Sequence, residues 1–354
     1  MTDYLDNGNS IADSKPHLEQ LFFDLYGQKI KLTNNIFLGL NLQWPNFDLP
    51  STYSKYVLSF HTEYINLEWV IAQAKKIYPK SVVVLTDYKV LPADAWPDNI
   101  HFIQWITIHK QIKLLQNQVG VNNNIQEPTY KISSLSFRIS QYKNFVTAYL
   151  LKNFKHDDMI LTYHGFLGKP EDLHGHPKGY SQLDQLDFSL LKKLTLNFDD
   201  NFSGDSPVNN GNWLNACYTD SLINLTNESF HYSNTIIDNQ DYCWPGPYLT
   251  EKTFKPLLAG RPFLVVGQYQ TYEFLHSLGF NVNFGFDISY DNDSGDMTRI
   301  CKLFKTLDHI NVTSKKQLFD ASVDAVEYNL KWIQSNNFYD HCQSINQKLN
   351  LSIF

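Results

Sequence analysis

Residues 55–87 read KYVLSFHTEYINLEWVIAQAKKIYPKSVVVLTD, and this stretch decides the fold class. Its first six residues favour a strand, and residues 63–78 repeat apolar side chains at helical spacing. The run 81–87 is rich in β-branched residues and is bounded by Pro79 and Asp87, which is typical of a strand buried on both faces. A strand, a helix and a strand in direct succession predict a parallel sheet in an α/β domain.

The same pattern continues in both directions from this stretch. Strands are predicted at 30–34, 36–40, 101–106, 130–135, 159–164, 221–226, 263–267 and 280–284, and helices at 109–118, 140–154, 271–279 and 314–349. The polar run 119–128 separates two such series and is the predicted linker. We therefore expect two Rossmann-like α/β domains that face a cleft, an N-terminal domain at 1–125 and a C-terminal domain at 126–335, with a helical tail at 336–354.

The composition argues against several classes of protein. The net charge is −7 and the chain has no basic run, so we expect no strong nucleic-acid footprint. The four cysteines form no CxxC pair, which argues against a zinc site and a disulfide framework. No apolar run approaches the roughly 18 residues of a membrane span, and the N-terminus is polar and acidic. These features predict a soluble cytoplasmic protein.

The segment most suggestive of chemistry is PGPYLTEKTFKPLLAGRPFLVVG, residues 245–267. Thr250 is a suitable N-cap for a helix that ends at Gly260. Free N–H groups and the helix dipole attract anions to a helix N-terminus. Lys252 adds a positive charge there, and the hydroxyl of Tyr248 adds a hydrogen-bond donor. The segment therefore predicts a site for a diphosphate.

Glu251 stands in the first turn of the same predicted helix. Its carboxylate cannot bind phosphate, but it can accept hydrogen bonds from the two hydroxyls of a ribose. Glu251 and Lys252 together would thus contact two parts of one nucleotide. The alternative is an exposed Glu–Lys pair on an ordinary helix.

Three segments in a fixed order give the chain a resemblance to a known family. They are INLTNES at 223–229, YLTEK at 248–252 and LAGRPFLVVG at 258–267. In order, separation and expected element type, they resemble the donor site of the family 10 glycosyltransferases, which are α-1,3/1,4-fucosyltransferases. Viral and phage relatives of that family are also similar to GFNVNFGFDISYD at 279–291. The resemblance covers 217–291 closely and 130–335 loosely.

The resemblance implies a role for several residues of the C-terminal domain. The diphosphate and ribose of a nucleotide sugar would be bound by Tyr248, Glu251 and Lys252. Glu228 would lie near the donor, at the end of its strand. The family also holds phosphate with an Arg at the start of the first helix of this domain, where this chain offers Arg138 and, as the alternative, Lys143. The family has Glu–Asn where this chain has Glu228–Ser229, so the donor stays open between GDP-fucose and another nucleotide sugar.

Sugar transfer with inversion needs a general base on the acceptor hydroxyl. In this fold the base comes from the N-terminal domain, where Glu63 stands at a strand-to-helix turn, with His61 and Asp87 as alternatives. The cations Lys252 and Arg138 can stabilise the leaving diphosphate. No cofactor is therefore required, and a divalent metal is allowed but not predicted.

The acidic pair Asp291 and Asp293 lies in a loop rich in Gly, Ser and Asn, which predicts a solvated turn rather than a metal site. The sequence thus predicts a glycosyltransferase that moves a hexose or pentose from a nucleotide sugar to the hydroxyl of a glycan acceptor. Two alternatives stay open. One is a viral or phage enzyme that acts on hydroxymethylated bases in DNA, and the other is a module that binds a nucleotide sugar without catalysis.

Overall fold

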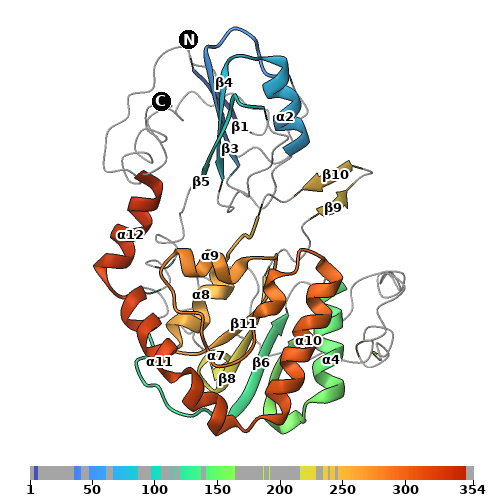
Figure 1. Ribbon diagram of the computed structural model, residues 1–354, viewed down its shortest axis with the longest axis vertical. Coiled ribbons are helices and arrows are strands. Elements are labelled where there is room, and N and C mark those ends of the chain that lie inside the picture. Colours follow the sequence, from blue (N-terminus) through green and yellow to red (C-terminus); the bar gives the residue numbers. More distant parts are fainter. Residues whose placement is uncertain are drawn as a thin grey trace. The chain divides into compact units, whose positions relative to one another are not determined.

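The computed structural model shown in Figure 1 divides into two compact units. The structure describes residues 4–6, 36–40, 48–60, 67–86, 97–104, 112, 116, 120–136, 141–163, 186, 191, 216–228, 234–237, 240–243 and 246–347. The first unit comprises Met1–Thr107, Tyr232–Tyr248 and Tyr339–Phe354, and the second comprises Ile108–His231 and Leu249–Phe338.

These units differ in extent from the predicted domains at 1–125, 126–335 and 336–354. Residues 108–125 belong to the second unit, where the N–H of Asn122 donates to the carbonyl of Leu258 at 2.9 Å. Two later segments of the chain belong to the first unit. A chain that passes between units more than once leaves no local signal in its sequence, because the contacts that define a unit join segments far apart along the chain.

The first unit contains a parallel sheet with the strand order β1-β2-β3-β4-β5. Its strands and its helix are β1 (Tyr4–Asp6), β2 (Ile36–Leu40), β3 (Lys55–Phe60), α2 (Leu67–Lys76), β4 (Ser81–Thr86) and β5 (Ile100–Gln104). The strand–helix–strand order predicted for residues 55–87 and its parallel sheet are confirmed. An antiparallel pair, β9 (Asn234–Ile237) and β10 (Gln240–Cys243), was not predicted.

The β-branched run in β4 explains why the strand lies in the middle of the core. Val82, Val83 and Val84 are all fully buried. Because successive side chains of a strand point to opposite faces, burial of all three means that both faces of the sheet are covered at this point. Asp87 lies outside the described residues.

The second unit contains a parallel sheet with the strand order β11-β8-β6-β7. The strands are β6 (Tyr130–Ser136), β7 (Met159–Tyr163), β8 (Ser221–Asn227) and β11 (Phe263–Val266). The helices are α4 (Gln141–Asn153), α7 (Ala216–Thr219), α8 (Glu251–Leu258), α9 (Thr271–Ser277), α10 (Asp296–Val312) and α11 (Lys315–Ile333), with single turns η1 (His156–Asp158) and η3 (Ser289–Asn292). Helix α12 (Asn336–Gln347) follows α11.

Helices cover the two faces of this second sheet (Figure 1). Helix α4 connects β6 to β7, whereas α8 connects β8 to β11 on the other side of the sheet. Since such crossovers are right-handed, strands added in opposite directions place their helices on opposite faces. Helix α10 packs against α4, and α11 packs against α8. Within the part of the chain that the structure describes, no helix is both long enough and apolar enough to cross a membrane.

The prediction of a strand at 280–284 is wrong, because this segment has no regular secondary structure in the protein. The N–H of Asn281 donates to the side chain of Asn329 at 2.8 Å, and Nδ2 of Asn329 donates to the carbonyl of Asn281 at 2.8 Å. One amide side chain from α11 thus takes both main-chain groups that a neighbouring strand would use. Gly279 and Gly285 flank the segment with φ of 87° and 78°, outside the conformation of a strand. Helix α10 was not predicted.

Two buried tyrosine hydroxyls meet the outer edge of β11. The N–H of Val265 donates to the hydroxyls of Tyr272 and Tyr290, both at 3.1 Å. Tyr290 donates in turn to the carbonyl of Val265 at 2.8 Å, and Tyr272 donates to the carbonyl of Phe263 at 3.1 Å. The segment 279–291 therefore has a structural role, because its Tyr290 completes the hydrogen bonding of β11.

The prediction of a solvated turn is wrong for Asp291, which is 3% exposed. Its carboxylate accepts from the N–H of Tyr272 at 2.8 Å, and its carbonyl accepts from the N–H of Gln270 at 2.8 Å. Asp291 therefore holds the first turn of α9 against η3. Asp293 lies closer to the surface and forms an ion pair with Lys302 at 2.6 Å.

The contribution of Asp291 to the free energy of unfolding should fall as the pH rises from about 4 to about 7. Burial raises the pKa of this carboxyl to about 7, against the opposing effect of hydrogen bonds from Tyr272 and Thr271. The folded chain then keeps a proton that the unfolded chain releases near its ordinary pKa of 3.8. The stabilisation is complete below that value and is lost as the pH rises through about 7.

Urea midpoints measured between pH 4.5 and 7.5 check this prediction. The difference between wild type and Asp291→Asn should change steadily across the range, because the variant has no proton to lose at this position. The matched control is Asp287→Asn, which changes an exposed aspartate of the same loop. A constant difference for Asp291→Asn would contradict the prediction.

Candidate functional site

The strand order of the second unit defines a point where connections diverge. From β6 the chain crosses to β7 on one side, and from β8 it crosses to β11 on the other. In doubly wound α/β sheets, ligands bind beyond the carboxyl ends of the two strands at such a switch point. Here these ends are Ser136 of β6 and Asn227 of β8. The candidate site is built outward from these two residues.

Asn227 joins the two strand ends at the switch point. Its Nδ2 donates to the hydroxyls of Ser134 and Ser136 at 3.0 and 3.1 Å, and to the carbonyl of Leu135 at 3.3 Å. Asn227 is 2% exposed, and its Oδ1 has no hydrogen-bond partner among the residues that the structure describes. The Oδ1 atom can therefore still accept a hydrogen bond, although the bonds that Nδ2 donates keep the amide group in place.

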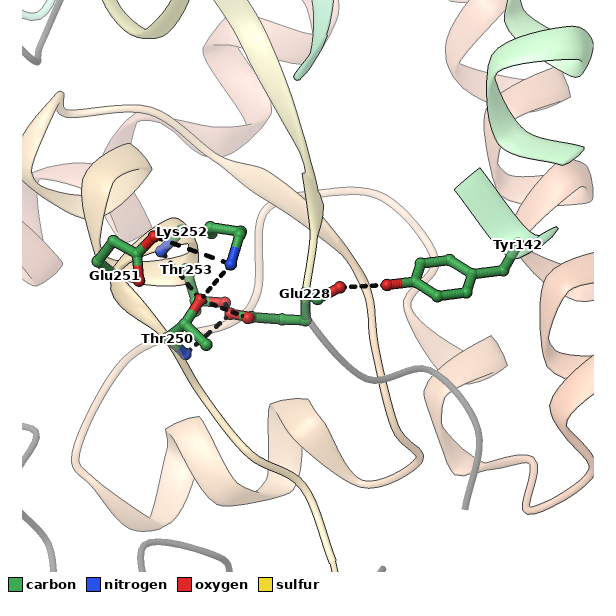
Figure 2. Close-up of polar contacts among 6 residues, drawn as sticks. All are labelled: Tyr142, Glu228, Thr250, Glu251, Lys252 and Thr253. Atoms are coloured by element: carbon green, nitrogen blue, oxygen red, sulfur yellow. Dashed lines mark hydrogen bonds and ion pairs between the residues drawn. The ribbon is translucent and has the colours of Figure 1, made fainter. Parts of the chain in front are cut away.

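Glu228 follows at the end of β8, and its carboxylate is taken up entirely by residues at the start of α8 (Figure 2). Oε1 accepts from the N–H of Thr250 at 3.2 Å and from the hydroxyl of Thr253. Oε2 accepts from the hydroxyl of Thr250 at 2.6 Å. Glu228 is 1% exposed. The structure therefore places Glu228 at the strand end, as predicted, but turns its carboxylate toward the protein.

Helix α8 begins and ends close to the predicted positions. Thr250 is the N-cap, and its hydroxyl accepts from the N–H of Lys252 at 3.3 Å. The helix ends at Leu258, and Gly260 follows with a φ of 66°, the left-handed conformation that favours glycine after a helix. The N-cap and the helix end could be read from the sequence because capping depends on neighbouring residues only.

The expectation of free N–H groups at the N-terminus of α8 is wrong for Thr250, Lys252 and Thr253. The N–H of Thr250 donates to Glu228, that of Lys252 donates to the Thr250 hydroxyl, and that of Thr253 donates to the Thr250 carbonyl at 3.2 Å. Glu228 also places a carboxylate where the helix dipole favours negative charge. These three N–H groups are therefore not available to a phosphate, so side chains would supply most of its contacts at this helix.

Glu251 and Lys252 are the partly exposed charged residues of this first turn. Their side chains are 30% and 33% exposed, and Oε1 of Glu251 lies 3.8 Å from Nζ of Lys252. Burial opposes the charge of Glu251, but the ammonium groups of Lys252 and Lys255 outweigh it and lower the pKa of the carboxyl. Glu251 is therefore a carboxylate at neutral pH, ready to accept hydrogen bonds from hydroxyls.

Lys255 lies one turn further along α8 and is fully buried. Burial lowers the pKa of its amine to about 7, while the carboxylates of Glu251 and Glu228 act in the opposite direction. The sequence pattern did not single out this lysine. The signal available was its spacing, because a residue four positions after Glu251 lies on the same side of a helix.

The other predicted site residues fall in three places. Lys143 stands in the first turn of α4, is buried, and has its ammonium 5.7 Å from the ring centroid of Tyr142. Tyr142 itself donates to the main-chain carbonyl of Glu228, a link that sequence reasoning missed (Figure 2). Tyr248 is partly exposed and ends a segment of the first unit. Arg138, Glu63, His61 and Asp87 lie outside the described residues.

Metal ligation has no support in the described part of the chain. Among those residues, no group of three or more His, Cys, Asp and Glu side chains could hold a metal ion. The acidic pair considered in the sequence, Asp291 and Asp293, has other partners. Asp291 accepts a hydrogen bond from the N–H of Tyr272, and Asp293 forms an ion pair with Lys302. What the described site offers is a carboxylate and an ammonium on the first turn of α8, and a buried amide oxygen at the end of β8.

Comparison with known proteins gives no further assignment. Neither a protein-family model, nor a curated protein, nor a solved structure matches this chain.

Proposed function

We propose that the chain is a glycosyltransferase whose second unit binds a nucleotide-sugar donor at the β6/β8 switch point. One observation carries the proposal. Glu251 and Lys252 stand side by side, partly exposed, on a helix turn that Glu228 fixes to the end of β8. A nucleotide sugar needs both kinds of group within a short distance, because its ribose hydroxyls donate hydrogen bonds and its diphosphate is negatively charged.

In this proposal each group meets the part of the donor that suits its chemistry. The carboxylate of Glu251 accepts from the ribose hydroxyls, and the ammonium of Lys252 binds the diphosphate. Tyr248 donates its hydroxyl to the same diphosphate. Arg138 or, as the alternative, Lys143 in the first turn of α4 supplies further positive charge. The amide oxygen of Asn227 favours a ligand that brings hydrogen-bond donors, as a sugar does.

The proposed reaction is transfer with inversion between two Rossmann-like domains of the GT-B kind. The first unit would supply the acceptor side and the general base, for which Glu63 is the candidate. The base removes the proton of the acceptor hydroxyl, whose oxygen forms a bond to the anomeric carbon of the sugar. The bond from that carbon to the diphosphate breaks on the opposite side, and the nucleoside diphosphate leaves with both electrons. Lys252 and Arg138 stabilise its charge, so no metal is required.

The donor is a GDP-fucose-like or another nucleotide sugar, and the acceptor is a glycan hydroxyl. The net charge of −7 makes a hydroxymethylated base in DNA the less favoured acceptor, since a DNA-binding face is usually basic. A module that binds the donor without transfer would keep the same residues. Slow hydrolysis of the nucleotide sugar in the absence of acceptor would separate an enzyme from such a module.

A thermal-shift screen of GDP-, UDP- and CMP-sugars tests the proposal. A donor present at 100 times its dissociation constant adds about 2.7 kcal/mol of stability. For a unit of about 200 residues this corresponds to an increase in melting temperature of roughly 5–10 °C. The proposal fails if no nucleotide sugar raises the melting temperature at millimolar concentration.

Replacement of Glu251 by Ala should weaken binding of the selected nucleotide about tenfold, or about 1.4 kcal/mol. The loss should disappear with the 2′,3′-dideoxy form of the same nucleotide, because the hydroxyls that Glu251 contacts are then absent. Titration calorimetry with both nucleotides measures the two effects.

The matched control is Glu273→Ala, which removes an exposed carboxylate from α9. It should leave both affinities unchanged. An equal loss for the ribose and dideoxy nucleotides with Glu251→Ala would show that the carboxylate does not contact the ribose.

A further inference from the structure

Glu228 has a role that the proposed donor site does not include, and the inference about it rests on the proposed function. Its carboxylate oxygens accept three hydrogen bonds, all from Thr250 and Thr253. The side chain is 1% exposed. Glu228 therefore has no surface left for a donor molecule, although it lies next to the residues that are proposed to bind one.

The residues that Glu228 holds stand at the two ends of one helix turn. Thr250 is the N-cap of α8 and Thr253 is three positions later, so the carboxylate spans the turn. Glu251 and Lys252 are the two residues between them. Fixing both ends of the turn also fixes the directions in which these two side chains leave the helix (Figure 2).

Glu228 is itself held firmly by the sheet. Its N–H donates to the carbonyl of Val266 in β11 at 3.0 Å. Its carbonyl accepts from the hydroxyl of Tyr142 in the first turn of α4. The main chain of Glu228 thus joins β11 to the start of α4, while its side chain joins the end of β8 to the start of α8.

We infer that Glu228 is a positioning residue, which acts on the donor only through the orientation of Glu251 and Lys252. Glutamine has the same size but cannot accept all three hydrogen bonds in the same arrangement. Valine at position 253 keeps the shape of threonine and removes one of the donors. Either change should loosen the turn while leaving Glu251 and Lys252 in the sequence.

Three variants test the inference, namely Glu228→Gln, Thr253→Val and the control Ser133→Ala. Ser133 is buried in the same sheet, donates to Asn224 Oδ1 at 2.9 Å and accepts from the hydroxyl of Ser221 at 2.8 Å. The control thus removes buried hydrogen bonds away from α8. We expect the first two variants to speed amide hydrogen exchange at residues 250–253 and to weaken nucleotide-sugar binding about tenfold. Ser133→Ala should lower the melting temperature without either effect.

A double-mutant cycle separates positioning from direct contact. In a Glu251→Gln background, Glu228→Gln should weaken nucleotide-sugar binding by clearly less than the tenfold expected in the wild type, because only the orientation of Lys252 remains to be lost. Additive losses would overturn the inference, as would unchanged hydrogen exchange or an equal loss of affinity in Ser133→Ala. If the wild type binds no nucleotide sugar, the proposed function itself fails, and the inference fails with it. If the wild type binds a nucleotide sugar but the losses of affinity in the double-mutant cycle are additive, the inference about Glu228 is wrong and the proposed function stands.

Discussion

Replacement of Lys252 by Ala is expected to remove nearly all of the thermal stabilisation that a nucleotide sugar gives this protein. Lys252 brings an ammonium to the first turn of α8, where it lies 3.8 Å from the Glu251 carboxylate and is 33% exposed. The main-chain N–H groups of Thr250, Lys252 and Thr253 are already used within the protein. A diphosphate bound as we propose would therefore depend mainly on side chains at this helix.

The size of this effect follows from the strength of hydrogen bonds to charged groups. Loss of contacts worth roughly 2–3 kcal/mol weakens binding about 100-fold. A ligand concentration that was 100 times the dissociation constant then only equals it, and the stabilisation falls from about 2.7 to about 0.4 kcal/mol. Thermal shift measured at one fixed ligand concentration detects this difference directly.

Two companion variants sharpen the Lys252 experiment. Lys316→Ala removes a lysine from α11 that pairs with Asp320, and it should leave the shift intact. Lys252→Arg keeps the positive charge and should restore part of the shift. A full shift in Lys252→Ala would mean that the nucleotide binds elsewhere in the chain.

Replacement of Arg299 by Met is expected to give the largest loss of stability, about 3–5 kcal/mol. Arg299 is 1% exposed and donates to the carbonyls of Gly267 and Asp293 at 3.1 and 2.8 Å. It also forms an ion pair with Asp296 at 2.8 Å. Methionine would fill much of the space but would leave the two carbonyls and the carboxylate without these donors.

Calorimetry of the ligand-free protein measures this loss as a fall in melting temperature of about 10 °C or more. Lys302→Met is the control, because Lys302 pairs with Asp293 in the same loop but is 47% exposed, and exposed ion pairs contribute roughly 0–1 kcal/mol. A change in Arg299→Met no larger than that of the control would show that the buried guanidinium is not needed for stability.

Features that depend on neighbouring residues could be predicted from the sequence. The β-branched run in β4 specified a strand buried on both faces, and Thr250 and Gly260 marked where α8 begins and ends. The place of Glu251 and Lys252 in the first turn of α8 could be predicted for the same reason, since both follow the N-cap directly.

Features that depend on distant residues could not be predicted. Nothing near Glu228 in the sequence shows that Thr250 and Thr253 will occupy its carboxylate, because these residues follow more than 20 positions later. The irregular path of 280–284 depends on Asn329 in α11. The residues of that segment favour a strand by their intrinsic propensity. The hydrogen bonds with Asn329 override this propensity, and they cannot be read from the local sequence.

The tyrosine hydroxyls at the outer edge of β11 also bear on how the protein behaves in a crowded solution. A strand edge with unused donors and acceptors is a template on which a second chain can add, and such additions lead to domain swapping and aggregation. At Val265 both the N–H and the carbonyl are already bonded to Tyr272 and Tyr290, so an incoming strand finds no partner there. These two side chains thus protect this end of the sheet against self-association.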